Sequence, residues 1–112
     1  ANFDDITTIK YSQSTGITQI SSQIPRAFSL SQNYPNPFNP VTILEFEIPK
    51  AGFVSLKIYD MLGKEINTLV NSNLNPGRYK YDFDAGSLTS GIYFYTLNVN
   101  EFKQTGKMLL VK

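Results

Sequence analysis

Three prolines stand within six positions of the stretch Tyr34-Pro-Asn-Pro-Phe-Asn-Pro40, and they constrain the fold more than any other feature of this chain. Each proline fixes its own φ angle, lacks a backbone donor and pushes the preceding residue towards extended geometry. This stretch, called the proline segment, therefore cannot be a helix or a central strand. We predict that it is a stiff entrance to a folded domain, with Tyr34 and Phe38 as aromatic anchors.

The size and composition limit what the chain can do. It has 112 residues and a net charge of +1, which fits one small domain preceded by an extension. Without cysteine or histidine, disulfides are impossible, and zinc binding and nucleophilic catalysis lose their usual side chains. We therefore expect no cofactor, no metal and no catalytic residues, and the near-zero charge argues against a nucleic-acid partner. Because the sequence opens with Ala-Asn-Phe rather than Met, we interpret it as the C-terminal piece of a longer precursor.

Short stretches that alternate between apolar and polar residues fill the sequence after the proline segment, and such alternation predicts half-buried strands. The expected strands are Val41–Ile48, Phe53–Tyr59, Lys64–Val70, Arg78–Asp84, Ile92–Val99 and Phe102–Val111, with Phe28–Leu30 as a short edge strand before them. Asp60 and Gly63 predict a tight hairpin, and Asn75-Pro76-Gly77 predicts a type II turn that ends a polar loop over residues 71–77. Because each sheet must bury one face, we predict an all-β, immunoglobulin-like antiparallel sandwich of about seven short strands.

The alternation also predicts which side chains enter the core. The inward-facing residues are expected to be Leu44, Phe46, Ile48, Val54, Leu56, Ile58, Tyr79, Tyr81 and Phe83. Leu88 is expected to close one end of the core. Ile92–Val99 carries apolar residues on both faces, which indicates a central strand.

The sequence before residue 28 is polar and irregular. Ile6–Tyr11 is one plausible strand, whereas Ser12–Gln32 is rich in Ser, Thr and Gln, and we interpret it as a linker that packing on a neighbour partly orders. Alternatively, Ile6–Tyr11 is the last strand of an upstream domain. We therefore divide the chain into an extension over residues 1–27 and a sandwich domain over residues 28–112.

Carboxylates are the first candidates for chemistry. Glu45 and Glu47 share one side of a strand, as do Asp82 and Asp84, and such pairs could serve acid–base catalysis. Neither pair shows the apolar pocket that such an acid catalyst needs, so a solvated sheet face is the favoured interpretation. Calcium at Asp60, Asp82 or Asp84 is chemically possible, but no loop has the dense acidic spacing of a calcium site.

Tyrosines are the second candidates. Tyr79, Tyr81, Tyr93 and Tyr95 alternate along two predicted strands and could form a platform for a sugar or a peptide. Aromatic rows on strands more often form cross-strand pairs or enter the core, and this is the interpretation that we favour.

The stretch Lys107–Lys112 sets a further constraint. Four consecutive apolar residues between two lysines would be an aggregation hazard if they formed a bare sheet edge. Either the strand is fully built into the sandwich or its end is presented to a partner, and both can hold together.

A series of motifs follows in order over residues 28–112. The motifs are the proline segment (with Tyr34, Pro35, Asn36, Pro37 and Phe38), Tyr59-Asp60, Gly63-Lys64-Glu65, Pro76-Gly77, the stretch from Ser90-Gly91 to Leu97, and Lys107–Lys112. Together they resemble the type A C-terminal sorting domain of the type IX (Por) secretion system. Lys64 stands where that family often has Arg, which keeps the charge.

The resemblance implies a non-catalytic sorting signal with an immunoglobulin-like fold at the end of a cargo protein. It implies export by a Sec signal, then passage across the outer membrane through the type IX translocon after a shuttle protein has read the C-terminal end. A sortase-like peptidase then cuts upstream, and the cargo is attached to surface lipopolysaccharide or released. Residues 1–27 would be the end of the passenger protein and its linker, with the cut between Ser21 and Gln32.

Mapped onto this sequence, the resemblance implies a set of residues for recognition by the translocon. These residues are Gly63, Lys64, Gly91, Lys107, Met108, Leu109, Leu110, Val111 and Lys112. The alternative functions are a carbohydrate-binding or protein-binding module, for which the tyrosines would be responsible, and a structural spacer of an extracellular enzyme.

Overall fold

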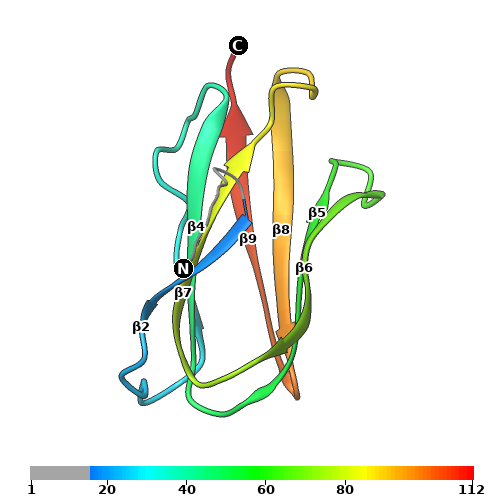
Figure 1. The fold of residues 1–112 in the computed structure, drawn as a ribbon. Coiled ribbons are helices and arrows are strands. Elements are labelled where there is room, and N and C mark those ends of the chain that lie inside the picture. The colour runs from blue at the N-terminus through cyan, green and yellow to red at the C-terminus, as the bar shows by residue number, and fades with distance from the viewer. Residues whose placement is uncertain (1–15) are drawn as a thin grey trace, which may run out of the picture.

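Two antiparallel sheets of four strands each form the structure, a computed structural model that describes residues 16–112 (Figure 1). The first, called the β4 sheet, has the strand order β2 (Gly16–Ser21), β7 (Gly77–Asp84), β4 (Val41–Ile48), β3 (Ser29–Leu30). The second, called the β8 sheet, has the order β6 (Glu65–Leu74), β5 (Gly52–Tyr59), β8 (Gly91–Val99), β9 (Phe102–Leu110). No helix occurs among the described residues, and the predicted all-β sandwich is confirmed.

The core lies between the two sheets, and the alternation of the sequence places it there. The inward-facing side chains of β4 and β5 are at most 1% exposed: Leu44, Phe46, Ile48, Val54, Leu56 and Ile58. Burying a side chain of this size contributes about 1.5–3 kcal/mol each. Tyr79 and Phe83 of β7 are buried too, whereas Tyr81 is only partly buried against the same cluster. Leu88 packs against one part of the core, as predicted.

Backbone pairing confirms the predicted central position of Ile92–Val99. Strand β8 lies between β5 and β9, so both of its edges are hydrogen-bonded. In the other sheet, Phe46 of β4 lies opposite Tyr79 of β7, and their rings stack with centroids 5.5 Å apart. Such cross-strand aromatic pairs help to fix the register of a sheet.

The region between β6 and β7 differs from the prediction. Strand β6 continues to Leu74 because Asn71–Leu74 pair with Gly52–Ser55 of β5, so the predicted polar loop over residues 71–77 is wrong. Residues Asn75 and Pro76 alone connect the two strands. Gly77 has a φ of 154°, far from the value near +80° that a type II turn requires, so that turn type is also wrong. Backbone pairing outweighs polar composition here.

The segment before residue 28 also contains more structure than a linker would. Gly16–Ser21 form β2, which pairs with the outer edge of β7. The sequence hid this strand because its isoleucines do not enter the core: Ile17 is 36% exposed and Ile20 is 41% exposed. The strand expected over Ile6–Tyr11 lies outside the described residues, and the division of the chain after residue 27 stays a prediction.

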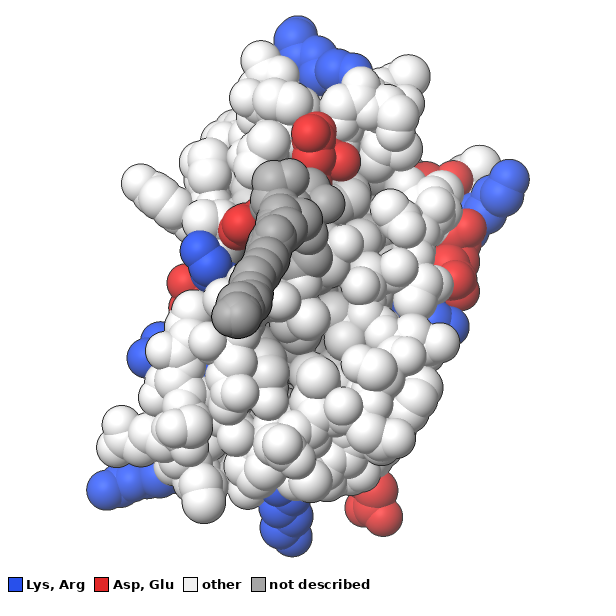
Figure 2. All heavy atoms as spheres, viewed as in Figure 1, with Lys and Arg blue, Asp and Glu red and all other residues white. Residues whose placement is uncertain are grey.

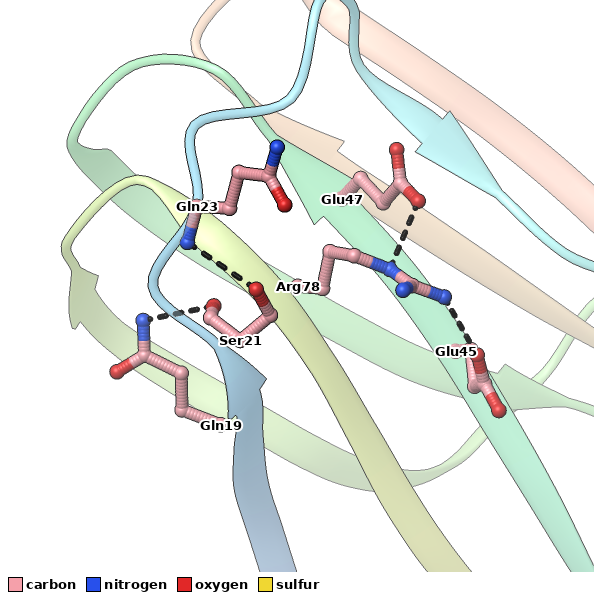
Figure 3. Close-up of polar contacts among 6 residues, drawn as sticks. All are labelled: Gln19, Ser21, Gln23, Glu45, Glu47 and Arg78. Atoms are coloured by element: carbon pink, nitrogen blue, oxygen red, sulfur yellow. Dashed lines mark hydrogen bonds and ion pairs between the residues drawn. The ribbon is translucent and has the colours of Figure 1, made fainter.

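Charged side chains of both signs lie mostly at the margins of the face in Figure 2, and a few acidic groups lie further inside it. On the outer side of the β4 sheet, the Arg78 Nε lies 3.0 Å from the Glu47 Oε2, and the Arg78 Nη2 lies 3.8 Å from the Glu45 Oε1 (Figure 3). The side chains are partly exposed, so this carboxylate pair belongs to the solvated sheet face that the sequence favours.

Candidate recognition site at the end of the sandwich

The proline segment connects the edges of the two sheets. It first continues the line of β3 along β4, where Tyr34 and Ile43 exchange two backbone hydrogen bonds of 3.0 and 2.8 Å. It then reaches the end of β9 in the other sheet. There the Phe38 N–H donates to the Leu109 carbonyl and the Val111 N–H donates to the Phe38 carbonyl, both at 3.0 Å. The segment therefore supplies backbone partners to both sheets.

Side chains complete the cover over the β9 edge. The Asn36 side-chain oxygen accepts the N–H of Leu109 at 2.9 Å, and the Gln32 side-chain amide donates to the Lys107 carbonyl at 2.8 Å. Backbone groups along this edge that would otherwise be free to pair with another chain are thus already bonded. The aggregation hazard suggested by the sequence is removed within the domain.

The two expected aromatic anchors behave differently. Phe38 is 2% exposed and lies against Phe83, with ring centroids 6.5 Å apart, so it anchors the segment as predicted. Tyr34 is 77% exposed, and its prediction as an anchor is wrong. It pairs with Ile43, which alternates with the buried Leu44 and so lies on the outer face of β4, and residues opposite each other point to the same face.

A buried polar network fixes the start of the proline segment. The Tyr95 hydroxyl donates to the Ser31 carbonyl and accepts the Asn33 N–H, both at 3.0 Å. The Asn33 side-chain amide donates to the Thr42 hydroxyl at 3.0 Å and to the Pro35 carbonyl at 3.2 Å. The Thr42 hydroxyl donates to the same carbonyl at 2.8 Å. Asn33 is 2% exposed and Thr42 is fully buried, so each bond replaces one that water would otherwise make.

Gly106 lets Tyr95 reach this network. The two residues lie opposite each other in β8 and β9, and a Cβ built on Gly106 would lie 2.2 Å from the Tyr95 ring. Only a residue without a side chain allows the ring to approach the strand so closely. Sequence reasoning missed Asn33, Thr42 and Gly106, although a Thr among inward-facing positions and a Gly inside a strand are signals that could have found them.

The residues proposed for recognition come from three separate parts of the chain. Gly63 and Lys64 belong to the hairpin between β5 and β6, where the Asp60 carboxylate accepts the N–H groups of Leu62 at 2.9 Å and Lys64 at 3.0 Å. Gly63 has a φ of +84°, a left-handed conformation that favours glycine, so the predicted hairpin is confirmed. Gly91 begins β8, and Lys107–Lys112 include the end of β9.

A shallow depression lies between two of these parts, the hairpin and the start of β8. It has a volume of about 220 Å³ and is lined by Asp60, Met61, Leu62, Ser90, Gly91, Ile92 and Tyr93. Leu62 is 93% exposed and Met61 is 66% exposed, which places large apolar side chains in water beside it. These two side chains therefore add exposed apolar surface to this end of the domain.

Lys112 connects the third part, Lys107–Lys112, to the end of the sandwich that carries Gly91. Its backbone N–H donates to the Ser90 hydroxyl at 3.0 Å, next to Gly91. Its ammonium group donates to the carbonyls of Gly86 and Leu88 at 2.7 and 2.8 Å. Figure 1 shows the C-terminal end and the loop between β7 and β8 close together at one end of the sandwich. The structure therefore brings Gly91 and the end of β9 together, with the hairpin across the depression.

The end of β9 has two chemically different faces. Met108 and Leu110 are at most 1% exposed and belong to the core, whereas Leu109 is 38% exposed and Val111 is 48% exposed. Leu109 lies opposite Ile92, and Lys107 lies opposite Phe94, so the outward side chains continue into an apolar surface on β8. A partner that contacts the folded domain from outside therefore meets Lys107, Leu109 and Val111 rather than the buried pair.

The tyrosines that could have formed a binding platform for a sugar or a peptide are mostly buried. Tyr79, Tyr93 and Tyr95 are at most 7% exposed, so the favoured interpretation as packing residues is confirmed for these three. Burial raises the pKa of the Tyr79, Tyr81 and Tyr95 hydroxyls above the ordinary value.

Within residues 16–112 there is no group of three or more acidic residues that could hold a metal ion. That part of the chain also contains no helix able to cross a membrane.

The fold and this end surface define a small β-sandwich module built around contacts of its last strand. Comparison with known families is specific: the chain belongs to the secretion system C-terminal sorting domain family, whose model matches residues 32–112. No curated protein and no solved structure matches the chain significantly. Membership of this family makes the domain a C-terminal sorting signal of type IX secretion. It interacts with the secretion machinery and directs the protein that carries it to the cell surface or to release.

The contact between Tyr95 and Gly106 generates a stability prediction. We expect Gly106→Ala to lower the free energy of unfolding by about 1–3 kcal/mol, because the new methyl group overlaps the tyrosine ring. Urea denaturation of the full chain measures the loss. In a Tyr95→Ala background the same substitution should cost much less. Equal costs in the two backgrounds would show that the ring is not the cause.

The raised tyrosine pKa values generate a pH prediction. The unfolded state loses these protons near pH 10, whereas the folded state keeps them to higher pH. Stability is therefore complete below about pH 10 and falls as the pH rises through the folded-state values. We expect Tyr95→Phe to reduce the slope of stability against pH, measured by urea denaturation from about pH 9 to about pH 11. Tyr34→Phe, a change at an exposed side chain, is the control, and equal slopes in both variants would contradict the assignment.

Proposed function

We propose that a type IX shuttle protein reads the outward side chains at the end of β9, together with the hairpin and the start of β8. The cargo reaches this step in the periplasm after export by a Sec signal. The observation that carries the proposal is the alternation of buried and exposed side chains at the end of β9. Met108 and Leu110 are buried in the core, whereas Lys107, Leu109 and Val111 are exposed to a partner. A strand held by the proline segment presents these side chains in one fixed arrangement, which lowers the entropic cost of binding.

The proposed cut by a sortase-like peptidase falls within the earlier range from Ser21 to Gln32. Residues 22–27 run between β2 and β3, and most of them are exposed, with Ile24 at 66%. Exposed connections without strand pairing are the usual places of proteolysis. After the cut, the upstream passenger is attached to surface lipopolysaccharide or released with β2 still joined to it, and the rest of the sandwich is the part that is removed.

A carbohydrate-binding module is the weaker candidate. An exposed aromatic row was the feature expected of it, and three of the four tyrosines are buried. Binding at the end surface instead fits a protein partner, because the exposed residues there are aliphatic side chains and a lysine rather than stacked rings.

The outward face of β9 provides a direct test. We expect Lys107→Glu and Leu109→Ser to reduce the amount of cargo at the cell surface and in the medium by at least ~10-fold, which corresponds to the loss of about 1.4 kcal/mol of binding. The free energy of unfolding should change by about 1 kcal/mol or less, because both side chains lie outside the core. Immunoblots of periplasmic, surface and medium fractions measure the export.

Two controls separate recognition from folding. Lys103→Glu makes the same charge change on the same face of β9 but at its other end, and it should leave export unchanged. Met108→Ala should instead destabilise the domain by about 2–5 kcal/mol. If Lys107→Glu and Leu109→Ser are exported as well as Lys103→Glu, the end of β9 is not the recognised surface.

A further inference from the structure

Strand β2 is attached to the sandwich mainly by its backbone. Its residues pair with Arg78–Asp82 of β7, and the ladder is interrupted by a bulge between Gln19 and Ser21. No β2 residue belongs to the core cluster. Figure 3 shows β2 alongside β7. The side chains of Gln19 and Ser21 make hydrogen bonds within residues 19–23, and the Gln19 amide also donates to the Pro76 carbonyl at 3.4 Å. An edge strand without core contacts is among the least stable parts of a fold.

The edge that β2 covers carries an unusual order of charges. The outward residues of β7 are Arg78, Lys80, Asp82 and Asp84, so the sign changes halfway along the strand. Between the basic and the acidic half stands Tyr81, flanked at equal distance by Tyr79 and Phe83.

This order is self-complementary when two β7 strands pair antiparallel around Tyr81. Lys80 of one copy then lies opposite Asp82 of the other, and Arg78 lies opposite Asp84. Opposite charges placed directly across a strand pair are stabilising and like charges are destabilising. Moving the centre by one residue places Lys80 opposite Lys80 or Asp82 opposite Asp82, and moving it by two places Arg78 opposite Lys80 or Asp82 opposite Asp84. The register centred at Tyr81 is therefore the one that pairs these four residues without placing like charges opposite each other.

The ionic contacts within one molecule leave Lys80 and Asp82 able to pair with a second copy. Arg78 is engaged by Glu45 and Glu47 of β4. Lys80 has only a long contact with Asp82, 3.9 Å from the Nζ to the Oδ1. That Asp82 oxygen is buried and accepts no hydrogen bond from any described residue. A lysine placed directly across the strand would supply the missing partner.

We propose that the edge of β7 is a self-pairing surface covered by β2, and that two copies of this domain join through it once β2 is removed. The pairing would merge the two β4 sheets into one continuous sheet across the two-fold axis. This inference rests on the proposed function in one respect. The proposed cut between β2 and β3 is the event that would detach β2 together with the passenger. The paired domain is thus a product of cargo release.

The first experiment removes β2 pairing in the full chain. Two adjacent prolines, Thr18→Pro with Gln19→Pro, eliminate ladder donors whichever residue faces β7. Sedimentation equilibrium should show the unmodified chain as a monomer and the variant as a dimer, with a dissociation constant at least ~10-fold lower. A specific-protease site placed over residues 22–27 gives a second route to the same state should the prolines prevent folding. A dimer of the unmodified chain that the prolines abolish would show exchange of β2 instead and would overturn the proposal.

The second experiment tests the register by charge. In the β2-disrupted background, Lys80→Asp alone and Asp82→Lys alone should each stay monomeric, because each places like charges opposite each other. A mixture of these two variants should form a heterodimer, since every central pair is then complementary. A mixture that stays monomeric, or a single variant that dimerises as well as its parent, would overturn the proposal. Failure here leaves the export of the cargo unaffected, so it is distinguishable from failure of the sorting function.

Discussion

The pairing of Phe38 with the end of β9 is the contact on which the rest of this structure depends. A strand at the edge of a sandwich exposes a row of backbone groups, and most proteins must cover or interrupt that row. Here the cover is the proline segment, whose three prolines have no N–H to offer to a further strand. Phe38 and the Asn36 side chain pair with β9 on one side. The same segment that closes the sheet therefore prevents its extension.

This cover explains how one strand can complete the core and still present side chains at the surface. Met108 and Leu110 complete the core, and the intervening Leu109 remains on the surface in a fixed position because its backbone is bonded to the proline segment. The buried network between Tyr95, Asn33 and Thr42 ties that segment to the middle of β8. Under the proposed recognition, these side chains take up their arrangement only in the folded domain, so a misfolded cargo would not display them.

The alternation of the sequence was sufficient to predict most of the fold, because half-buried strands must alternate. It correctly predicted β4, β5 and the central position of β8, and the family motifs pointed to the end of β9. It missed β2, whose residues enter no core and therefore carry no pattern. It could not separate Phe38 from Tyr34, since a proline segment has no period from which a buried side can be inferred.

The sequence proposed which residues form the candidate site, but it could not predict how they are arranged. Four consecutive apolar residues at the end of β9 do not reveal which two are buried, because that depends on the register with β8. The contact between Tyr95 and Gly106, and the polar network beyond it, joins residues that only the tertiary fold brings together. Such contacts are invisible to any argument from local sequence.

Amide hydrogen exchange at Leu109 and Val111 tests this account most directly, because these two N–H groups donate to the proline segment. Two-dimensional NMR of the full chain would follow both amides alongside those of β8. We expect them to exchange as slowly as the amides of β8, which report global unfolding. Exchange at the rate of an unstructured peptide, while β8 stays protected, would show that the end of β9 is not held in place and would contradict the account.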